Sequence, residues 1–169
     1  MRRAGHLTWV SAGGGPLLLL DRRFLPRWLG DTPASPHAGT DYDRACAIDD
    51  YVGLVNVGSG HGLVLDDEPL QTAWWPAEAI GGGILVRWRW APDEMAVVRA
   101  LGQLEGIVWQ TTGCTLPVAT GDLLLFDAAD SGAAVSDCLS IALRPGDYDV
   151  TTTLHSPDRD TALILHRLI

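Results

Sequence analysis

The sequence contains no lysine, and all 12 of its formally basic residues are arginines. Asp and Glu number 21, so the formal net charge is -9. Nucleic-acid binding relies mainly on Lys and Arg side chains that neutralise phosphates, so this composition argues against a nucleic-acid partner. It argues equally against an anionic membrane surface and favours a basic protein as the partner.

Cysteine is also scarce. Cys46, Cys114 and Cys138 lie far apart without a C-x-x-C motif, which excludes a disulfide framework or a zinc ribbon. We expect buried, reduced thiols, as is usual for free cysteines in a cytoplasmic protein. Long apolar runs are missing too, because residues 1–20 are broken by His6, by Ser11 and by glycines. Neither a signal peptide nor a membrane-spanning helix is therefore expected.

Apolar residues make up 47% of the chain, enough for one folded domain over residues 1–169. Residues 86–90 alternate apolar and charged side chains, so Trp88 and Trp90 should share one face of a strand, opposite Arg87 and Arg89. The predicted fold class is α+β, predominantly antiparallel β with one or two short helices. Strands are expected at residues 7–11, 16–20, 51–57, 62–66, 71–75, 84–90, 107–111, 123–127, 138–143, 148–154 and 162–168.

Two segments have helical spacing. Residues 21–29 predict a short helix, and residues 31–40 have the composition of a loop. Pro92, Asp93 and Glu94 suit the first turn of a second helix. Its apolar stripe should consist of Met95, Val98, Leu101 and Leu104.

Residues 57–66 share a pattern with residues 118–127: Val, a small polar residue, Gly, three large apolar residues and Asp. One interpretation is an internal duplication that gives two related β-rich lobes, about 1–91 and 92–169. The other is that any glycine turn before a buried strand has this pattern.

Residues 41–68 contain seven acids and one arginine. Such a stretch can hold a metal ion, catalyse acid/base chemistry or attract a basic partner. Asp41 and Asp43 start like a calcium-binding EF-hand loop, but position six is Cys46 and position twelve is Val52, where that loop needs Gly and Glu. The five histidines are scattered, so we expect no metal site.

Catalytic motifs are equally weak. Ser59 and His61 lie on a glycine-rich segment that is more typical of a hairpin turn than of a nucleophile and its base. The glycine runs at 13–15 and 81–83 are not phosphate loops, because no lysine follows them. A pair of carboxylates that hydrolyses glycosidic bonds stays an open possibility, because the distance between two such groups is set by the fold and not by their spacing in the sequence. We expect no catalytic residues and no cofactor.

Seven tryptophans are many for this length. For any one of them core packing is the usual role, but aromatic residues beside acids are typical anchors of protein interfaces. Trp74 and Trp75 are adjacent, so they should face opposite sides of a strand. The predicted partner-binding residues are Asp49, Asp50, Asp66, Asp67, Glu68, Trp74 and Trp75. A structural role, with Asp side chains bonding backbone N–H groups, is expected for the motif Asp41, Tyr42, Asp43, Arg44 and Cys46.

These motifs occur in an order that resembles the bacterial immunity protein family numbered 21. The set in the first half consists of Trp9-Val10, Gly15-Pro16-Leu17, Trp28-x-Gly30, the segment 41–46, the segment 50–53, and 63–65 with Asp67-Glu68-Pro69 and Thr72. The second half adds the weaker motifs Leu125-Phe126-Asp127 and Gly146-x-Tyr148-x-Val150. The resemblance implies a cytoplasmic protein that binds and neutralises a cognate polymorphic toxin and is not an enzyme. Its acids would then face a basic toxin domain. The alternative is a small-ligand- or metal-binding β-rich domain, or an enzyme, that uses the 41–68 carboxylates.

Overall fold

The computed structural model describes residues 6–66 and 68–169, and its strands form two antiparallel sheets. The six-stranded sheet has the order β1 (Trp9–Val10), β5 (Thr72–Ala77), β6 (Gly82–Trp90), β11 (Thr161–Leu168), β10 (Gly146–Asp158) and β7 (Gln110–Val118). The five-stranded sheet has the order β3 (Val52–Val57), β4 (Gly60–Leu65), β2 (Leu17–Asp21), β8 (Asp122–Asp127) and β9 (Cys138–Ala142). The predicted α+β class with mostly antiparallel strands is confirmed.

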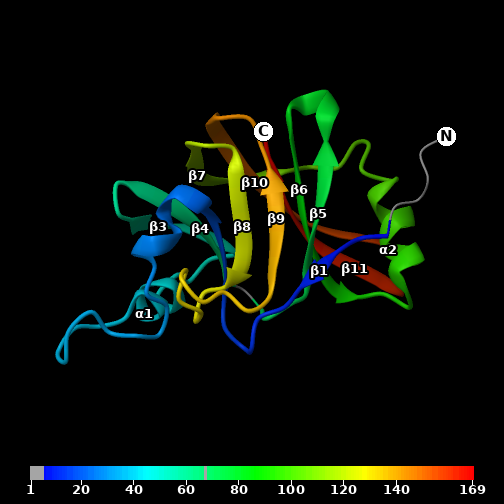
Figure 1. Ribbon diagram of the computed structural model, residues 1–169. Helices are drawn as coiled ribbons and strands as arrows, with labels where there is room; N and C mark the ends of the chain where they lie inside the picture. Colours follow the sequence, from blue (N-terminus) through cyan, green and yellow to red (C-terminus); the bar gives the residue numbers. More distant parts are fainter. Residues whose placement is uncertain (1–5, 67) are drawn as a thin grey trace.

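The sheets face each other across an apolar core, and short helices cover their outer faces (Figure 1). The 3₁₀ helix η1 (Arg22–Arg27) and α1 (Asp41–Cys46) pack on the five-stranded sheet, whereas α2 (Glu94–Leu101) packs on the six-stranded sheet. A second 3₁₀ turn, η2 (Glu78–Ile80), joins β5 to β6. β2 reads as an unbroken leucine run because a central strand between two layers is buried on both faces.

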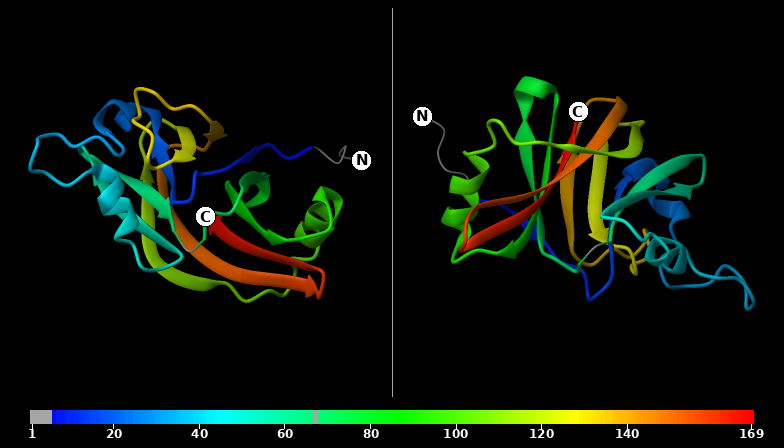
Figure 2. Two further views of the ribbon diagram at one scale, coloured as in Figure 1. Left: turned by 90° about the horizontal axis from the view of Figure 1, so that it is seen from below. Right: turned by 180° about the vertical axis from the view of Figure 1, so that it is seen from behind.

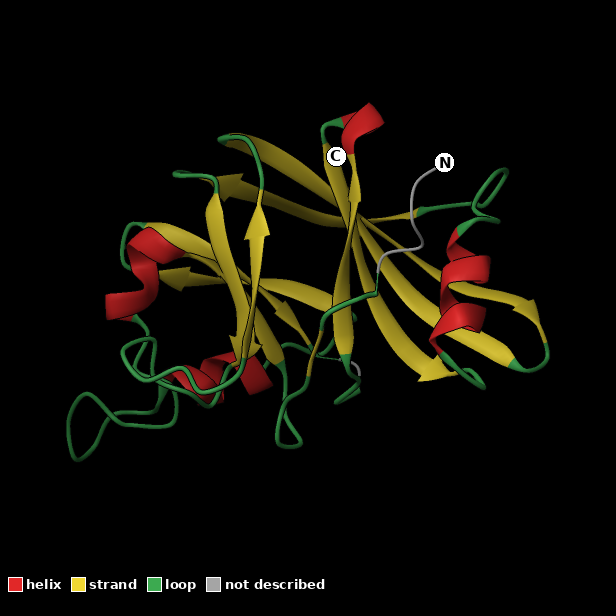
Figure 3. Ribbon diagram, turned by 45° about the vertical axis from the view of Figure 1, so that its right-hand side comes forward, coloured by secondary structure: helices red, strands yellow, loops and turns green. Residues whose placement is uncertain are grey.

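The six-stranded sheet extends beyond its partner. β10 spans 13 residues, and with β11 it continues past the five-stranded sheet toward α2 (Figures 1 and 2). Figure 3 shows the strands of the two sheets diverging toward this end. On the inner face Leu85, Val150 and Leu168 join the shared core. Arg87 of β6 pairs with Ile164 of β11, two residues beyond Leu85 in the direction of α2. These two residues lie outside the shared core.

A bulge corrects the prediction for the tryptophans of β6. Trp88 pairs with Leu163 and Trp90 pairs with Ala162, so Arg89 is an extra residue in β6. Ala162 and Leu163 are consecutive and face opposite sides of β11, so Trp88 and Trp90 do as well. Trp88 packs on the outer face, as expected from alternation, whereas Trp90 turns to the inner face.

Several other local predictions are wrong at least in part. The apolar stripe predicted for α2 is confirmed for the buried Leu101 and for Val98 and Leu104, which pack against the same cluster. It is wrong for Met95, which is 53% exposed; Ala96, Val97 and Ala100 complete the buried face of the helix. The strand expected at 107–111 is β7, which starts at Gln110. The segment 41–46, for which no helix was expected, is a helix. Its six residues are too few for a helical pattern of apolar residues to show in the sequence. Cys46 and Cys138 are exposed and Cys114 is partly buried, so the thiols are free but not buried in the core.

The strand order is regular about two central pairs, β6 with β11 and β2 with β8. On either side the orders run β6-β5-β1 and β11-β10-β7 in one sheet, and β2-β4 and β8-β9 in the other. If the two halves are duplicates, this strand order pairs β2 of one half with β8 of the other as equivalent strands. The sequence match of 57–66 with 118–127 instead makes β4 the equivalent of β8. A duplication with halves near 1–91 and 92–169 stays a prediction, as does the single domain. Within the described residues, no helix has the length and apolar character to cross a membrane.

Candidate functional site

Helix α1 is held at its first turn by the acids of its own motif. Thr40 and Asp43 form a reciprocal cap: the Thr40 hydroxyl accepts from Asp43 N at 3.0 Å, and Asp43 Oδ2 accepts from Thr40 N at 2.9 Å. Asp41 pairs with Arg44 at 2.7 Å and accepts the backbone N–H of Leu29 at 2.8 Å. The bonds from Thr40 lower the pKa of Asp43. These acids therefore have bonds within the fold that suit a structural role.

Tyr42 and Cys46 face each other on the same helix. A hydrogen bond with Cys46, together with burial, raises the pKa of Tyr42 to about 12. The Tyr42 ring packs beneath the five-stranded sheet. A Cβ added to Gly15 would lie 2.0 Å from the Tyr42 hydroxyl, so this tyrosine needs the glycine before β2.

The β3–β4 hairpin brings the two acidic motifs together. Val52 pairs with Leu65, so the residues before β3 and those after β4 meet at the same end of the hairpin. Asp66 N donates to Tyr51 O at 3.3 Å, and Asp50 Oδ1 accepts from Tyr51 N at 2.7 Å. Asp49 and Asp50 thus lie next to Asp66 and Glu68, although at least 15 positions separate them in the sequence.

The other wall comes from the six-stranded sheet. Arg89 donates to Glu68 Oε1 at 3.3 Å. Arg87 is fully buried, donates to the backbone carbonyl of Glu68 and lies 3.4 Å from Thr72 Oγ1. The two arginines therefore fix the loop that carries Glu68 to the edge of β6.

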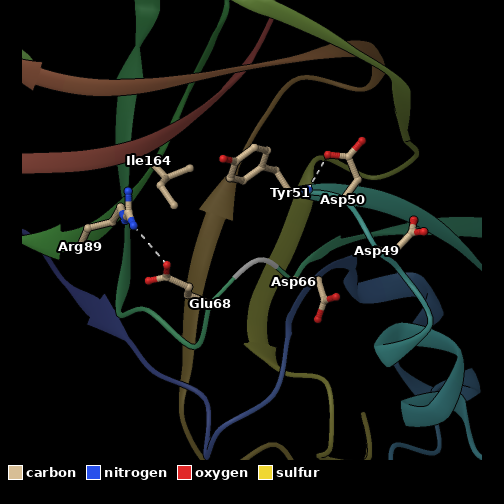
Figure 4. Close-up of a pocket in the computed structure, with 7 residues that line it drawn as sticks. All are labelled: Asp49, Asp50, Tyr51, Asp66, Glu68, Arg89 and Ile164. Atoms are coloured by element: carbon tan, nitrogen blue, oxygen red, sulfur yellow. Dashed lines mark hydrogen bonds and ion pairs between the residues drawn. The ribbon is translucent and has the colours of Figure 1, made fainter.

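Between these walls lies an open pocket of about 380 Å³. Figure 4 shows Asp49 and Asp50 on one side, Arg89 and Glu68 on the other, and the Tyr51 ring directed between them. No described residue forms an ion pair with Asp49 or Asp50, whereas Glu68 is paired with Arg89. The pocket is lined by Asp49, Asp50, Tyr51, Asp66, Glu68, Arg89 and Ile164.

A buried histidine lies behind this region. His166 is fully buried on β11, and its Nδ1 is hydrogen-bonded to Thr152 Oγ1. Burial, reinforced by the charge of Arg87, lowers the pKa of His166 to about 3. Its Nε2 has no hydrogen-bond partner among the described residues. His166 is therefore neutral at pH 7 and does not repel the nearby positive charge of Arg87.

The arrangement suits attraction of a cation better than bond-breaking chemistry. Among residues 6–66 and 68–169, no group of three or more His, Cys, Asp or Glu side chains is placed to hold a metal ion. Ser59 and His61 lie on the β3–β4 turn and the following strand, outside the acidic pocket. Several carboxylates around an open, solvent-filled space favour a positively charged group by Coulomb attraction.

The pocket unites four of the seven predicted partner-binding residues, Asp49, Asp50, Asp66 and Glu68. Asp67 lies outside the described residues. Trp74 and Trp75 do face opposite sides of β5: Trp74 packs toward the core between the sheets and Trp75 toward α2. Both tryptophans are partly buried and neither lines the pocket.

Sequence reasoning missed Tyr51, Arg89 and Ile164. Tyr51 stands inside the acidic motif and could have been noticed there as an aromatic beside two acids. Arg89 and Ile164 come from strands far along the chain, and only the pairing of β6 with β11 brings them together. No local pattern in the sequence indicates that Arg89 and Ile164 lie close together.

Comparisons with known proteins give one finding. A family model described as immunity protein 21 matches residues 8–161, which is most of the chain. Searches of curated proteins and of solved structures give no match. The matched region includes the five-stranded sheet, α1 and every strand of the six-stranded sheet except β11, of which it reaches only Thr161. It contains all the residues of the acidic pocket except Ile164.

Proposed function

The chain belongs to the immunity protein 21 family, and we propose that it binds and neutralises a cognate bacterial toxin without catalysing a reaction. It acts in the cytoplasm, where it covers a functional surface of the toxin domain. The partner is a protein, and no cofactor takes part. This is the role that the family description and the acidic site support together.

One observation carries the electrostatic part of the proposal. Asp49, Asp50, Asp66 and Glu68 come from two loops and converge on one pocket, on a protein of net charge -9. Carboxylates arranged in this way accelerate association with a basic protein and disfavour acidic ones. The toxin surface that meets this site is therefore basic, which suits an active site that handles anionic substrates.

Co-expression tests the function directly. Cells that produce the toxin domain encoded by the neighbouring gene should grow only when this chain is present. Purified protein should bind that toxin domain, with a Kd measurable by calorimetry. If the toxin is not neutralised and does not bind, the proposed function is wrong.

Charge reversal tests the acidic site. Asp49→Lys combined with Asp50→Lys should weaken binding by roughly tenfold or more, since like charges then face each other across the contact. The matched control reverses Glu105 and Asp147, two exposed acids outside the pocket, with the same change in net charge. Equal losses for both double variants would show that only overall charge matters.

Salt dependence separates the two effects further. Between about 0.1 M and about 1 M salt the Debye length falls from roughly 10 Å to roughly 3 Å. The affinity of the wild-type protein should fall across this range, and that of the Asp49/Asp50 variant should fall less. If the affinity of the Asp49/Asp50 variant depended on salt as steeply as that of the wild type, an electrostatic contact at this pocket would be contradicted.

A further inference from the structure

The acidic pocket continues into an exposed apolar strip on the same sheet face. Leu154 pairs with Ile164 and Trp90 pairs with Ala162, so their side chains share the inner face of the six-stranded sheet. Leu154 is 52% exposed and Trp90 is 49% exposed. We call the surface formed by Arg89, Trp90 and Leu154 around the buried Ile164, which is 1% exposed, the overhang. It is the part of the inner face that the five-stranded sheet does not cover.

The two sides of the resulting groove differ in charge. On the overhang side, the charge of Glu68 is compensated by Arg89 at 3.3 Å. On the opposite side, Asp49 and Asp50 have no ion-pair partner among the described residues, and the Tyr51 ring extends from this side toward Ile164. A cation that enters the groove therefore meets Asp49 and Asp50 on one side and the Tyr51 ring between the walls. On the other side it meets the Arg89–Glu68 ion pair, with the Arg89 guanidinium 5.0 Å from the centre of the Trp90 ring.

Building on the proposed function, we propose that this groove binds an arginine of the toxin together with a large apolar residue beside it. The guanidinium lies between Asp49 and Asp50 and stacks on Tyr51. The apolar neighbour covers Trp90 and Leu154. An arginine fits better than a lysine, because its planar group bonds carboxylates in a bidentate manner and stacks on aromatic rings.

The size of the site indicates a protein segment. The pocket of about 380 Å³ is large enough for a long side chain with its neighbours. The exposed Trp90 and Leu154 lie beyond the pocket and do not line it, so a small cation inside the pocket would leave them uncovered. Large aromatic and aliphatic residues bordered by charges are typical of protein interfaces.

Substitutions on the overhang test the apolar half of this contact. Trp90→Ala should weaken binding of the toxin domain by roughly 30-fold and Leu154→Ala by roughly fivefold, in the range of interface anchors. Met95→Ala and Val108→Ala are matched controls, because these side chains are 53% and 78% exposed outside the groove. The controls should change Kd by less than about twofold. Thermal unfolding of each variant reports whether it is folded.

A titration that needs no toxin tests the charged half. N-acetyl-arginine amide is added to isotope-labelled protein, with N-acetyl-citrulline amide as the neutral analogue of the same shape. The arginine compound should shift the backbone amide signals of residues 49–51 and 89–90, and the citrulline compound should not. Equal shifts with both compounds, or arginine shifts confined to other residues, would overturn the proposal.

The outcomes separate the groove from the function. If the toxin is neutralised but Trp90→Ala, Leu154→Ala and the Asp49/Asp50 variant bind as the wild type does, the groove is wrong and the function stands. If the wild type does not bind the toxin at all, the function is wrong, and the arginine titration alone decides whether the groove recognises a guanidinium.

Discussion

Two connections leave the central strands of the five-stranded sheet, and they differ in content. After β2 the chain forms η1, α1 and β3 before it reaches β4, whereas after β8 residues 128–137 lead directly to β9. Both connections cross the same outer face. Only the first one carries Asp49 and Asp50 to the pocket. The regular strand order thus builds the scaffold, and the longer connection adds the acidic wall.

The strands before these connections end alike. β2 ends at Asp21 and β8 ends at Asp127, and each carboxylate accepts the backbone N–H two residues later, at 3.0 Å and 2.9 Å. Each also bonds the turn that precedes the other strand. Asp21 accepts from Ala119 N and Thr120 N, whereas Asp127 accepts from Gly13 N. Local bonding is therefore similar at both strand ends, and the functional difference begins after them.

The two connections are docked onto each other through Trp28 and Gly30. Trp28 Nε1 donates to Ala128 O at 2.9 Å, and Trp28 O accepts from Gly132 N at 2.9 Å. Gly30 has φ of 63°, and a Cβ there would lie 2.3 Å from Ala129 O. This explains the motif Trp28-x-Gly30 as the joint between the longer and the shorter connection.

Removing that joint should have the largest effect on stability. Trp28 is fully buried, so Trp28→Ala should lower the free energy of unfolding by about 4 kcal/mol, from the lost packing and the unpaired Ala128 carbonyl. Urea unfolding measures this value. Trp28→Phe keeps most of the packing and should cost less. The half-exposed Trp90 is the control, and Trp90→Ala should cost about 1 kcal/mol or less.

A loss for Trp28→Ala no larger than that for Trp90→Ala would mean that the two connections are independent. The toxin affinity of the folded Trp28→Ala protein adds a second measurement. It should fall, because the acidic wall depends on how the first connection is docked.

The strand-end aspartates allow a smaller, pH-dependent comparison. Burial of the Asp21 carboxyl raises its pKa, but hydrogen bonds from Thr120, Arg23 and Ala119 outweigh burial and lower the pKa below 3.8. Asp21 is 2% exposed, and Asp21→Asn should cost about 2 kcal/mol at pH 7. Asp127 is less buried and accepts fewer bonds, so Asp127→Asn should cost less, about 1 kcal/mol.

The sign of the pH effect follows from the lowered pKa. Below the unfolded value the unfolded chain binds more protons than the folded one, so stability rises with pH across that window. The contribution of Asp21 is complete above about pH 4 and disappears as the pH falls through its folded pKa. The stability difference between wild type and Asp21→Asn should therefore shrink below pH 4. A difference that stays constant down to pH 2 would contradict the charged hydrogen bonds.

Much of the scaffold was predictable from the sequence, and the candidate site only in part. Apolar runs bounded by glycine turns located most strands, because buried strands need such residues whatever their partners are. The charge of the Asp49–Asp50 and Asp66–Glu68 motifs is enough to indicate partner-binding candidates. Their convergence depends on the register of the β3–β4 hairpin, which is a pairing property.

The missed features depend on pairing or on very short elements. The bulge at Arg89 turns Trp90 to the inner face, and only the partner strand β11 reveals it. Helix α1 has six residues, too few for a periodic pattern. Its N-terminal signal was present, since Thr40-x-x-Asp43 has the spacing of a reciprocal cap. The acidic composition of the segment favoured an interpretation as turns.

Helix caps give the smallest and most specific comparison. Thr40 caps α1, which leads into the acidic wall, and Asp93 caps α2 by accepting Ala96 N at 2.8 Å on the other side of the molecule. Thr40→Ala and Asp93→Ala should each lower the free energy of unfolding by about 1 kcal/mol, the usual loss for a cap. Their effects on toxin binding should differ.

Loss of the Thr40 cap loosens the first turn of α1 and, through it, the position of Asp49 and Asp50, so the toxin affinity should fall by roughly threefold to tenfold. Loss of the Asp93 cap loosens a helix that lies against the outer face of the six-stranded sheet, away from the pocket, and the affinity should stay within about twofold. Calorimetry of both variants with the toxin domain measures the difference at matched stability. Equal affinity losses would show that binding responds to global stability, and the longer connection would then have no special part in recognition.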